Sequence, residues 1–267
     1  MTRPGSVKRI TSTANPLIKA ARALHQRKAR QESGLFLAEG QKLVRDAMGV
    51  GWVPHMIVAL EPSGDDDPAA QLAAKVRAAG ADVVFANASV MEKLARRDNP
   101  QTVIGVFEQR FADLAAMGSG TIVALEAPRD PGNVGTIVRT ADAAGASGVI
   151  LVGASADPFG VEAVRATMGS IFHVPIARTD EQRFVAFAKK FRGRIVGTHL
   201  SGTSDYRTLS PDEPQMLVMG TEQAGLTDGL AAACDRLIRI PMAGAADSLN
   251  LAVATGIALY ELRRPFL

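Results

Sequence analysis

The second half of the chain alternates short apolar runs with helical stretches, and this alternation constrains the fold more than any other feature. Apolar runs of strand length occur at 121–127, 148–153, 173–177, 194–200, 215–221 and 236–242. Stretches with helical spacing lie at 133–145, 160–170, 180–192, 226–233 and 248–264. Strands that are apolar throughout are buried on both faces. The pattern therefore predicts an α/β fold with a mainly parallel sheet that helices cover on both sides.

The first 110 residues show the same alternation on a smaller scale. Asn15 followed by Pro16 is a helix start signal, and the basic stretch after it is predicted to be helical. Strand-like runs with helical stretches between them continue to residue 109. We therefore predict a small α/β domain over 1–110, a linker over 111–119 that ends in Gly and Ser, and a second domain over 120–267.

Positive charge is concentrated at the N-terminus. Residues 1–45 contain ten Lys and Arg against two acidic residues, whereas the rest of the chain has 20 basic and 25 acidic residues. Such an asymmetry indicates a basic surface for a polyanion such as RNA, but an ordinary solvated helix face has the same composition. Charge alone leaves both interpretations open.

Several classes of protein are not indicated by the sequence. No apolar run approaches the roughly 20 residues that span a bilayer, and the first 16 residues lack the apolar core of a secretory signal. The single cysteine, Cys234, fits a reducing compartment, so we expect a cytoplasmic protein. The scattered histidines predict no metal site, and the Gly-rich dinucleotide and phosphate-loop motifs are absent.

Three polar, glycine-containing turns follow predicted strands, at the sheet edge where open α/β folds bind ligands. The first turn contains Asn133, with Arg139 six residues later. The second contains Glu222 between two glycines, and the third contains Ser248 and Asn250 at the start of the last helix. Helix caps and surface turns would account for each of these turns singly.

Together, the turns and their flanking residues resemble the three motifs of the SpoU/TrmH family of RNA ribose 2′-O-methyltransferases, within the SPOUT superfamily. The similarity covers roughly 120–264 and includes the intervening stretch 164–178. One departure is Thr221, where the family usually has Asn or another small residue. The matching residues are, in motif order, Asn133, Gly135 and Arg139; Gly220, Glu222, Gly225 and Leu226; and Pro241, Ser248, Leu249 and Asn250.

The resemblance implies a catalytic domain whose C-terminal segment forms a deep trefoil knot, which patterning alone would not have suggested. It also implies a homodimer and S-adenosylmethionine as the cofactor. The residues that match the family's cofactor contacts are Gly220, Ile240 and Leu249, with Thr198 and Leu200 as further candidates.

The same resemblance assigns catalytic roles. Arg139 matches the family's essential arginine, but a guanidinium stays protonated in proteins and is a poor base. We expect Arg139 to bind a phosphate of the substrate and to offset charge on the ribose oxygen. Asn133, Ser248 and Asn250 would position the ribose and the loops, and Glu222 would hold Arg139 or its own turn.

The N-terminal half resembles the substrate-recruiting module of family members, which is similar to an RNA-binding ribosomal protein. The expected RNA contacts are Arg22, Arg27, Lys28, Arg30 and Lys42. Such a module favours 23S rRNA over tRNA as the substrate. The alternatives are a tRNA 2′-O-methyltransferase of the same family, a non-catalytic RNA-binding or ribosome-assembly protein with this fold, and an α/β enzyme that uses another nucleotide-like cofactor.

Overall fold

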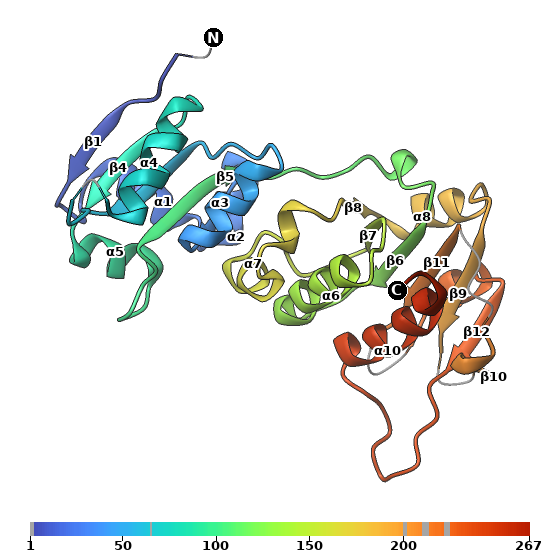
Figure 1. Cartoon of the computed structure of the whole chain (residues 1–267). Helices are drawn as coiled ribbons and strands as arrows, with labels where there is room; N and C mark the ends of the chain where they lie inside the picture. The colour runs from blue at the N-terminus through green and yellow to red at the C-terminus, as the bar shows by residue number, and fades with distance from the viewer. Residues whose placement is uncertain (1–2, 65, 200–201, 210–213, 222–224) are drawn as a thin grey trace. The chain divides into compact units, whose positions relative to one another are not determined.

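The structure, a computed structural model, describes residues 3–64, 66–199, 202–209, 214–221 and 225–267 (Figure 1). It divides into two compact units, each with its own sheet. The first unit contains Met1–Gln109 and Phe159–Phe172, and the second contains Arg110–Pro158 and His173–Leu267. The sequence pattern had placed 159–172 with the C-terminal domain, so this assignment differs from the predicted division.

The first unit is built on a five-stranded mixed sheet with the strand order β1-β4-β3-β5-β2. Strands β1, β4 and β3 are parallel, and β5 runs antiparallel to both β3 and β2. The elements are β1 (Val7–Ile10), α1 (Pro16–Ala23), α2 (Arg27–Ser33), β2 (Leu35–Glu39), α3 (Gln41–Gly49), β3 (Met56–Leu60), α4 (Pro68–Ala78), β4 (Asp82–Ala86), α5 (Ala88–Ala95), β5 (Val103–Glu108), α7 (Val161–Thr167) and the 3₁₀ turn η2 (Ser170–Phe172).

The predicted N-terminal helix is two helices. Asn15 caps α1 as expected, because its side chain accepts a hydrogen bond from the Leu17 amide at 2.9 Å. The chain then turns at Gln26, which is extended, and α2 follows. The carbonyl of Leu24, at the end of α1, accepts a hydrogen bond from Nη1 of Arg30 at 2.7 Å. This hydrogen bond provides a donor for a carbonyl at the end of the helix, where carbonyls have no partner within the helix.

An aromatic cluster holds 159–172 in the first unit. Phe159 lies against Phe36 with ring centroids 4.8 Å apart, and Phe172 lies against Phe107 at 4.9 Å and Trp52 at 5.3 Å. Phe36, Phe107 and Phe159 are at most 1% exposed. Each buried aromatic ring removes a large apolar area from water, so this cluster is a main source of stability for the segment.

The second unit is built on seven parallel strands in the order β10-β12-β9-β11-β6-β7-β8. The predicted mainly parallel sheet is therefore confirmed. The elements are η1 (Leu114–Ala116), β6 (Thr121–Glu126), α6 (Pro131–Ala143), β7 (Gly148–Val152), β8 (Ile176–Thr179), α8 (Glu181–Ala188), β9 (Arg194–Thr198), β10 (Ser204–Asp205), η3 (Tyr206–Thr208), β11 (Gln215–Met219), α9 (Asp228–Ala232), β12 (Arg236–Arg239), α10 (Leu251–Arg263) and η4 (Arg264–Phe266).

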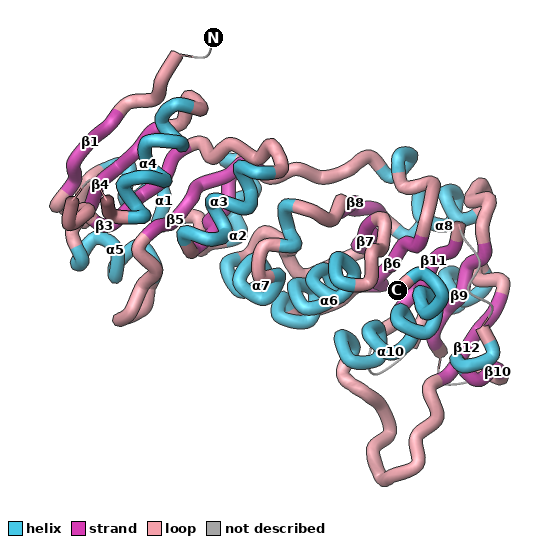
Figure 2. The backbone as a smooth tube through the Cα atoms, in the orientation of Figure 1, coloured by secondary structure: helices cyan, strands magenta, loops and turns pink. Residues whose placement is uncertain are grey.

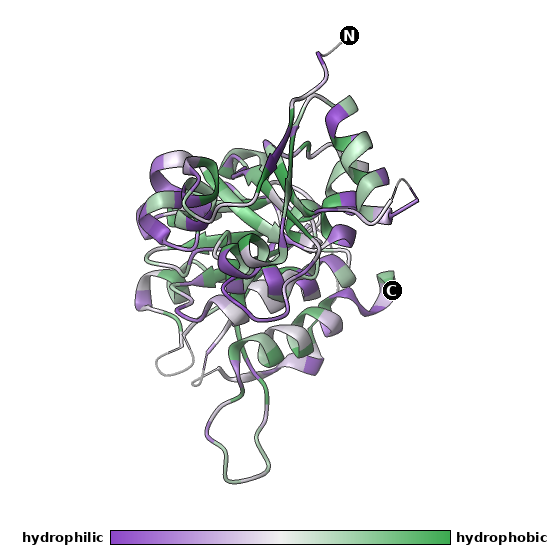
Figure 3. Cartoon of the chain, turned by 90° about the vertical axis from the view of Figure 1, so that its left-hand side faces the viewer, coloured by the Kyte–Doolittle hydropathy of each residue, from purple (hydrophilic) through white to green (hydrophobic). Residues whose placement is uncertain are grey.

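Helices cover both faces of this second sheet, as the apolar strands predicted. Helices α8 and α9 contact each other over one face, and α6 and α10 contact each other over the opposite one. Strands β7 and β11 are buried at every position, and in Figure 3, which faces the first unit, hydrophilic purple stretches lie mostly toward the outside of the ribbon. No described helix has both the length and the apolarity needed to cross a membrane.

The predicted linker is part of the second unit. The Ala112 amide donates to the Ile176 carbonyl at 2.8 Å, and Met117 is 4% exposed. The guanidinium of Arg178 lies 4.5 Å from the ring centroid of Phe111. These residues therefore pack against β8 and its neighbours, and the assignment of 111–119 as the linker stays a prediction.

One testable consequence of the packing concerns His25 in the first unit. Burial lowers the pKa of His25 below its ordinary value of 6.5, and the charges of Arg96 and Arg165 act in the same direction. The neutral ring donates from Nε2 to the Leu94 carbonyl at 2.7 Å. On acidification the unfolded chain therefore takes up a proton before the folded chain does, and stability is lost as the pH falls below the unfolded pKa.

We expect the free energy of unfolding to fall less steeply between about pH 7.5 and 5.5 in His25→Gln than in the wild type. Glutamine can still donate to the Leu94 carbonyl but does not titrate. Urea titrations at each pH measure the difference. If the free energy of unfolding changed equally with pH in the two proteins, this account of His25 would be wrong.

Candidate active site

A cavity of about 370 Å³ lies where β9, β11 and β12 end. All three strands are parallel, so their carboxyl ends lie at the same edge of the sheet. The end of β9 is linked to the end of β11, since the Thr198 hydroxyl donates to the sulfur of Met219 at 3.6 Å. The residues that line the cavity are Thr198, His199, Met219, Gly220, Thr221, Gly225, Ile238, Arg239, Ile240, Pro241, Met242, Asp247, Ser248, Leu249, Leu251 and Ala254.

The predicted cofactor residues fall at this cavity. Thr198, Gly220, Ile240 and Leu249 all line it, although they come from three separate parts of the chain. Leu200 lies outside the described residues. Sequence reasoning did not single out His199, whose ring lies next to Gly225. Its position directly after a buried strand, at the edge where ligands bind, was the available signal.

Two glycines allow the chain to approach itself at the second turn. A Cβ on Gly220 would lie 2.1 Å from the Gly225 carbonyl carbon, and Gly225 has a φ of +69°. The Thr221 amide donates to the Gly225 carbonyl at 2.9 Å, and the Gly225 amide donates back at 3.0 Å. Thr221 therefore pairs with Gly225 through backbone atoms. Another side chain at position 221 would leave these two hydrogen bonds intact. Glu222 lies outside the described residues.

The third turn is a long loop that precedes α10. Figure 2 shows residues 240–250 as a loop that extends away from the sheet. The prediction that Ser248 starts the last helix is wrong, because the N-cap is Asn250 and the helix begins at Leu251. The Asn250 side chain accepts from the amides of Ala252 at 2.9 Å and Val253 at 3.3 Å. Ser248 is thus left in the loop, where it lines the cavity.

The first and third turns meet through an amide pair. The alternative that Asn133 caps its helix is also wrong, since Asp130 is the N-cap and accepts from the Asn133 amide at 2.6 Å. The Asn133 side chain instead accepts a hydrogen bond from Nδ2 of Asn250 at 2.9 Å. One side chain, Asn250, therefore caps α10 with its oxygen and contacts α6 with its nitrogen.

Arg139 stands apart from this arrangement. It lies on the exposed side of α6 and is not among the residues that line the cavity. The structure thus brings together Asn133, Asn250 and the cavity loop, but it leaves the arginine facing solvent. Because folding leaves this guanidinium hydrated, the protein spends no free energy on burying its charge before a polyanion binds.

A buried carboxylate links the first turn to the second. Glu126, at the end of β6, is 7% exposed and accepts from the Thr227 amide at 2.9 Å. This contact fixes the chain that leaves the second turn. No local sequence pattern indicates this partner, which lies 101 residues away.

The single cysteine is not a nucleophile. Burial raises the pKa of Cys234 to about 12, and the carboxylates of Asp235 and Glu126 act in the same direction. The thiol is therefore protonated near neutral pH and unreactive. Among the described residues, no group of three or more His, Cys, Asp or Glu side chains is placed to hold a metal ion.

The predicted RNA contacts in the first unit are not equivalent. Arg27 and Lys28 are exposed on α2, and Arg22 is half-buried on α1. Lys42 is exposed and pairs with Asp46 one turn along α3. Arg30 differs from the others, because it is 5% exposed and its guanidinium is bonded to the end of α1. Helical patterning could not separate it from its exposed neighbours, and its contact with RNA stays a prediction.

Two family models match the chain, one in each half. Residues 120–260 match the model of the SpoU rRNA Methylase family. Residues 15–105 match the model of an MRM3-like substrate binding domain. The first match contains all three turns and the cavity, and the second contains the basic helices α1 and α2.

The chain is also similar over nearly its full length to named proteins. It is 31% identical to the 23S rRNA (guanosine(2553)-2'-O)-methyltransferase RlmP of Bacillus subtilis, covering 96% of this chain and 100% of that protein. It is 31% identical to the 23S rRNA (uridine(2479)-2'-O)-methyltransferase of Streptomyces viridochromogenes, covering 98% and 94%. The crystal structure of an AdoMet-bound rRNA methyltransferase from Sinorhizobium meliloti matches with 50% identity and a TM-score of 0.92, covering 98% and 99%.

Proposed function

This chain belongs to the SpoU rRNA methylase family, and we propose that it transfers a methyl group from S-adenosylmethionine to a ribose 2′-hydroxyl of 23S rRNA. It is an RNA ribose 2′-O-methyltransferase. The observation that carries the proposal is the cavity at the ends of β9, β11 and β12, formed by the second and third family motifs together.

The cavity fits the cofactor. Its volume of about 370 Å³ lies within the usual range for small-molecule sites. Its lining includes the stretch 238–242 and Gly220, and the absence of a side chain at Gly220 lets Gly225 approach closely. When bound there, S-adenosylmethionine supplies an activated methyl group. We propose Gly220, Ile240, Leu249, Thr198 and Leu200 as the residues that hold it.

The residues around the first turn position the ribose. The amide pair of Asn133 and Asn250 fixes the start of α6 against the start of α10, and Ser248 lies in the loop between the cavity and that pair. Holding the 2′-oxygen in line with the methyl group removes several kcal/mol of the barrier, on the order of the entropy cost of bringing two reactants together. Glu222 remains a proposed support for Arg139 or for the second turn.

Arg139 stabilises charge. Its guanidinium stays protonated, so it offsets the negative charge that develops on the 2′-oxygen and binds a neighbouring phosphate. The base is then another group or water, since a protonated guanidinium cannot accept the proton.

A map of 2′-O-methylation across all RNAs, compared between a deletion strain and its parent, tests the proposed function. We expect the loss of one ribose methylation in 23S rRNA and its return when the wild-type gene is restored. Loss in tRNA alone would favour the tRNA alternative. An unchanged map, together with no calorimetric binding of S-adenosylmethionine, would favour the non-catalytic alternative.

The last helix supports the proposal of a homodimer. Val253 is 52% exposed and Tyr260 is 45% exposed, and they lie seven residues apart on the face of α10 opposite its buried side. Ile257 lies between them and is half-buried. An exposed apolar stripe of this kind is typical of a helix that packs against a partner, and a second copy is the partner that the family resemblance implies.

We expect the double variant Val253→Asp and Tyr260→Asp to be monomeric by light scattering at concentrations where the wild type is a dimer. The matched control is Ala232→Asp on the exposed side of α9, which should remain dimeric. A wild-type protein that is itself monomeric, or a dimer that survives the double change, would refute the proposed interface.

Three further features belong to the proposal. The course of the chain supports a trefoil knot, since α10 follows β12, which lies near one edge of the sheet, and packs against α6, the central strand β11 and η3. We assign residues 1–110 to substrate binding, in a domain similar to a ribosomal protein, and 120–267 to catalysis. We also propose a cytoplasmic location, since the proposed substrate is ribosomal RNA.

A further inference from the structure

A buried carboxylate in the first unit holds two arginines. Glu39 ends β2, and its side chain is 2% exposed. Arg165 of α7 donates to it from Nη2 at 2.8 Å to each oxygen and from Nε at 3.1 Å. Arg97, two residues after the end of α5, donates from Nη1 to the same carboxylate at 3.4 Å. The three residues come from separate parts of the chain and meet only in the folded unit.

The arrangement leaves an excess of positive charge at the surface. One carboxylate faces two guanidinium groups, so the group of three carries a net charge of +1. The side chains of Arg97 and Arg165 are 42% and 41% exposed, although the carboxylate between them is buried. A guanidinium has five N–H donors in a planar fork, and a carboxylate uses at most two or three of them.

The first unit also contains a basic hollow. It has a volume of about 610 Å³ between α1 and α5, and it is lined by Lys19, Arg22, Ala23, Gln26, Glu92, Lys93 and Arg96. Four of these residues are cationic and one is acidic. Arg96 lines the hollow, and Arg97 is its neighbour in sequence.

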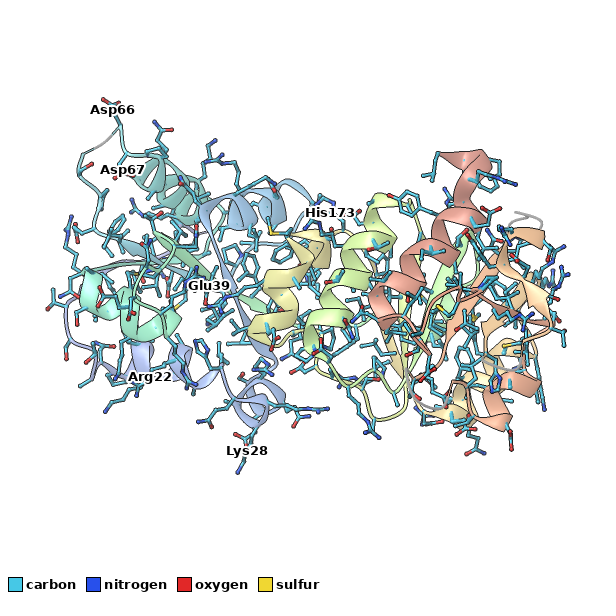
Figure 4. The ribbon with its side chains drawn as sticks, turned by 90° about the horizontal axis from the view of Figure 1, so that it is seen from below. Arg22, Lys28, Glu39, Asp66, Asp67 and His173 are labelled. Atoms are coloured by element: carbon cyan, nitrogen blue, oxygen red, sulfur yellow. The ribbon has the colours of Figure 1, made fainter. Side chains whose placement is uncertain are left out.

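Figure 4 shows how these residues lie in the first unit. Glu39 is inside the unit, whereas Arg22 and Lys28 lie toward its lower edge. The buried carboxylate restricts the rotamers of two long side chains before any ligand arrives, and such preorganisation lowers the entropy cost of binding. Planar guanidinium groups held in this way suit phosphate oxygens, which they bind through paired hydrogen bonds.

We propose that Arg97 and Arg165, held by Glu39, form a clamp for a phosphate of the RNA backbone, and that the basic hollow between α1 and α5 continues the same RNA track. This inference rests on the proposed function, because it requires an RNA substrate. It adds Lys19, Lys93, Arg96, Arg97 and Arg165 to the surface, and it gives 159–172 a role in substrate binding. Arg165 and Arg97 are positioning residues that do not touch the reacting atoms.

The test measures binding of a 23S rRNA domain transcript to the full-length protein across a range of KCl concentrations. The variant is Arg97→Gln, because the long contact of Arg97 with Glu39 leaves the shorter Glu39–Arg165 pair in place. We expect a several-fold rise in Kd and a salt slope smaller by about 1, as for the loss of one phosphate contact. Arg97→Lys should recover part of the affinity, and Lys93→Gln should act in the same direction as Arg97→Gln.

The matched control is Arg9→Gln in the same unit. Arg9 is also an arginine paired with a glutamate, since its Nε lies 2.9 Å from Oε1 of Glu61, but it lies on β1. Its removal should leave Kd and the salt slope unchanged. The melting temperature and the affinity for S-adenosylmethionine should be the same in all of these variants as in the wild type.

The outcomes separate the clamp from the enzyme activity. A wild-type protein that neither binds nor methylates rRNA would overturn the proposed function together with the clamp. A wild-type protein that methylates rRNA, with an Arg97→Gln variant that keeps its Kd and salt slope, would overturn the clamp alone. A lower melting temperature with an unchanged salt slope would also overturn it, because the arginines would then only brace α7 against β2.

Discussion

We expect the Gly220→Ala variant to lose most of its affinity for S-adenosylmethionine while it remains folded. The added Cβ would lie 2.1 Å from the Gly225 carbonyl carbon and 2.3 Å from its oxygen, so the second turn must move. Overpacking of this kind costs roughly 1–3 kcal/mol, which is about a 5- to 150-fold rise in Kd where the displaced backbone forms the binding wall. Isothermal titration calorimetry measures the change.

The control for this change is Gly244→Ala. Gly244 lies in the loop between β12 and α10, and a Cβ there would meet no atom within 4 Å. It should bind the cofactor as the wild type does. Wild-type affinity in Gly220→Ala would show that the cofactor is not held at the wall that Gly220 forms.

The second large effect is expected at Arg139. Arg139→Ala should lower the rate of methyl transfer by about 10²–10³-fold, as does the loss of a group that stabilises developing charge. Cofactor affinity should be unchanged, because Arg139 does not line the cavity. Single-turnover transfer of a labelled methyl group to a 23S rRNA transcript measures the rate separately from binding.

Two comparisons make the result specific. Arg183→Ala removes an exposed arginine from the same unit, on α8, and should leave the rate unchanged. Arg139→Lys keeps the charge but loses the planar fork, so the rate should remain well below the wild type. Turnover of Arg139→Lys close to that of the wild type would rule out a requirement for guanidinium geometry.

Patterns among neighbouring residues correctly predicted several strands and one helix start. The near-continuous apolar runs predicted buried parallel strands, and Asn15 with Pro16 predicted the start of α1. The same logic was less accurate at α6 and α10, where Asp130 and Asn250 are the caps. Several small polar residues lie near the first turn of each of these helices. The conformation of the preceding loop decides which of their side chains accepts hydrogen bonds from the unpaired backbone amides.

The candidate site was partly predictable for a related reason. Parallel strands bring their carboxyl ends to one edge, so turns after β6, β11 and β12 had to lie near one another. Motif order across three separated segments then identified the family. The amide pair between Asn133 and Asn250 was beyond such reasoning, because it joins residues 117 positions apart whose contact depends on how α6 packs against α10.

By itself, the sequence determined the α/β class, the basic N-terminus and the three turns that carry the chemistry, because each is written in neighbouring residues. The tertiary structure alone decided that Arg30 is buried at the end of α1 while Arg27 and Lys28 face solvent. It alone placed 159–172 in the first unit, where Arg165 reaches Glu39 across 126 residues. Burial and ion pairing between distant segments follow from the packing of whole elements, and no local pattern encodes which elements will meet.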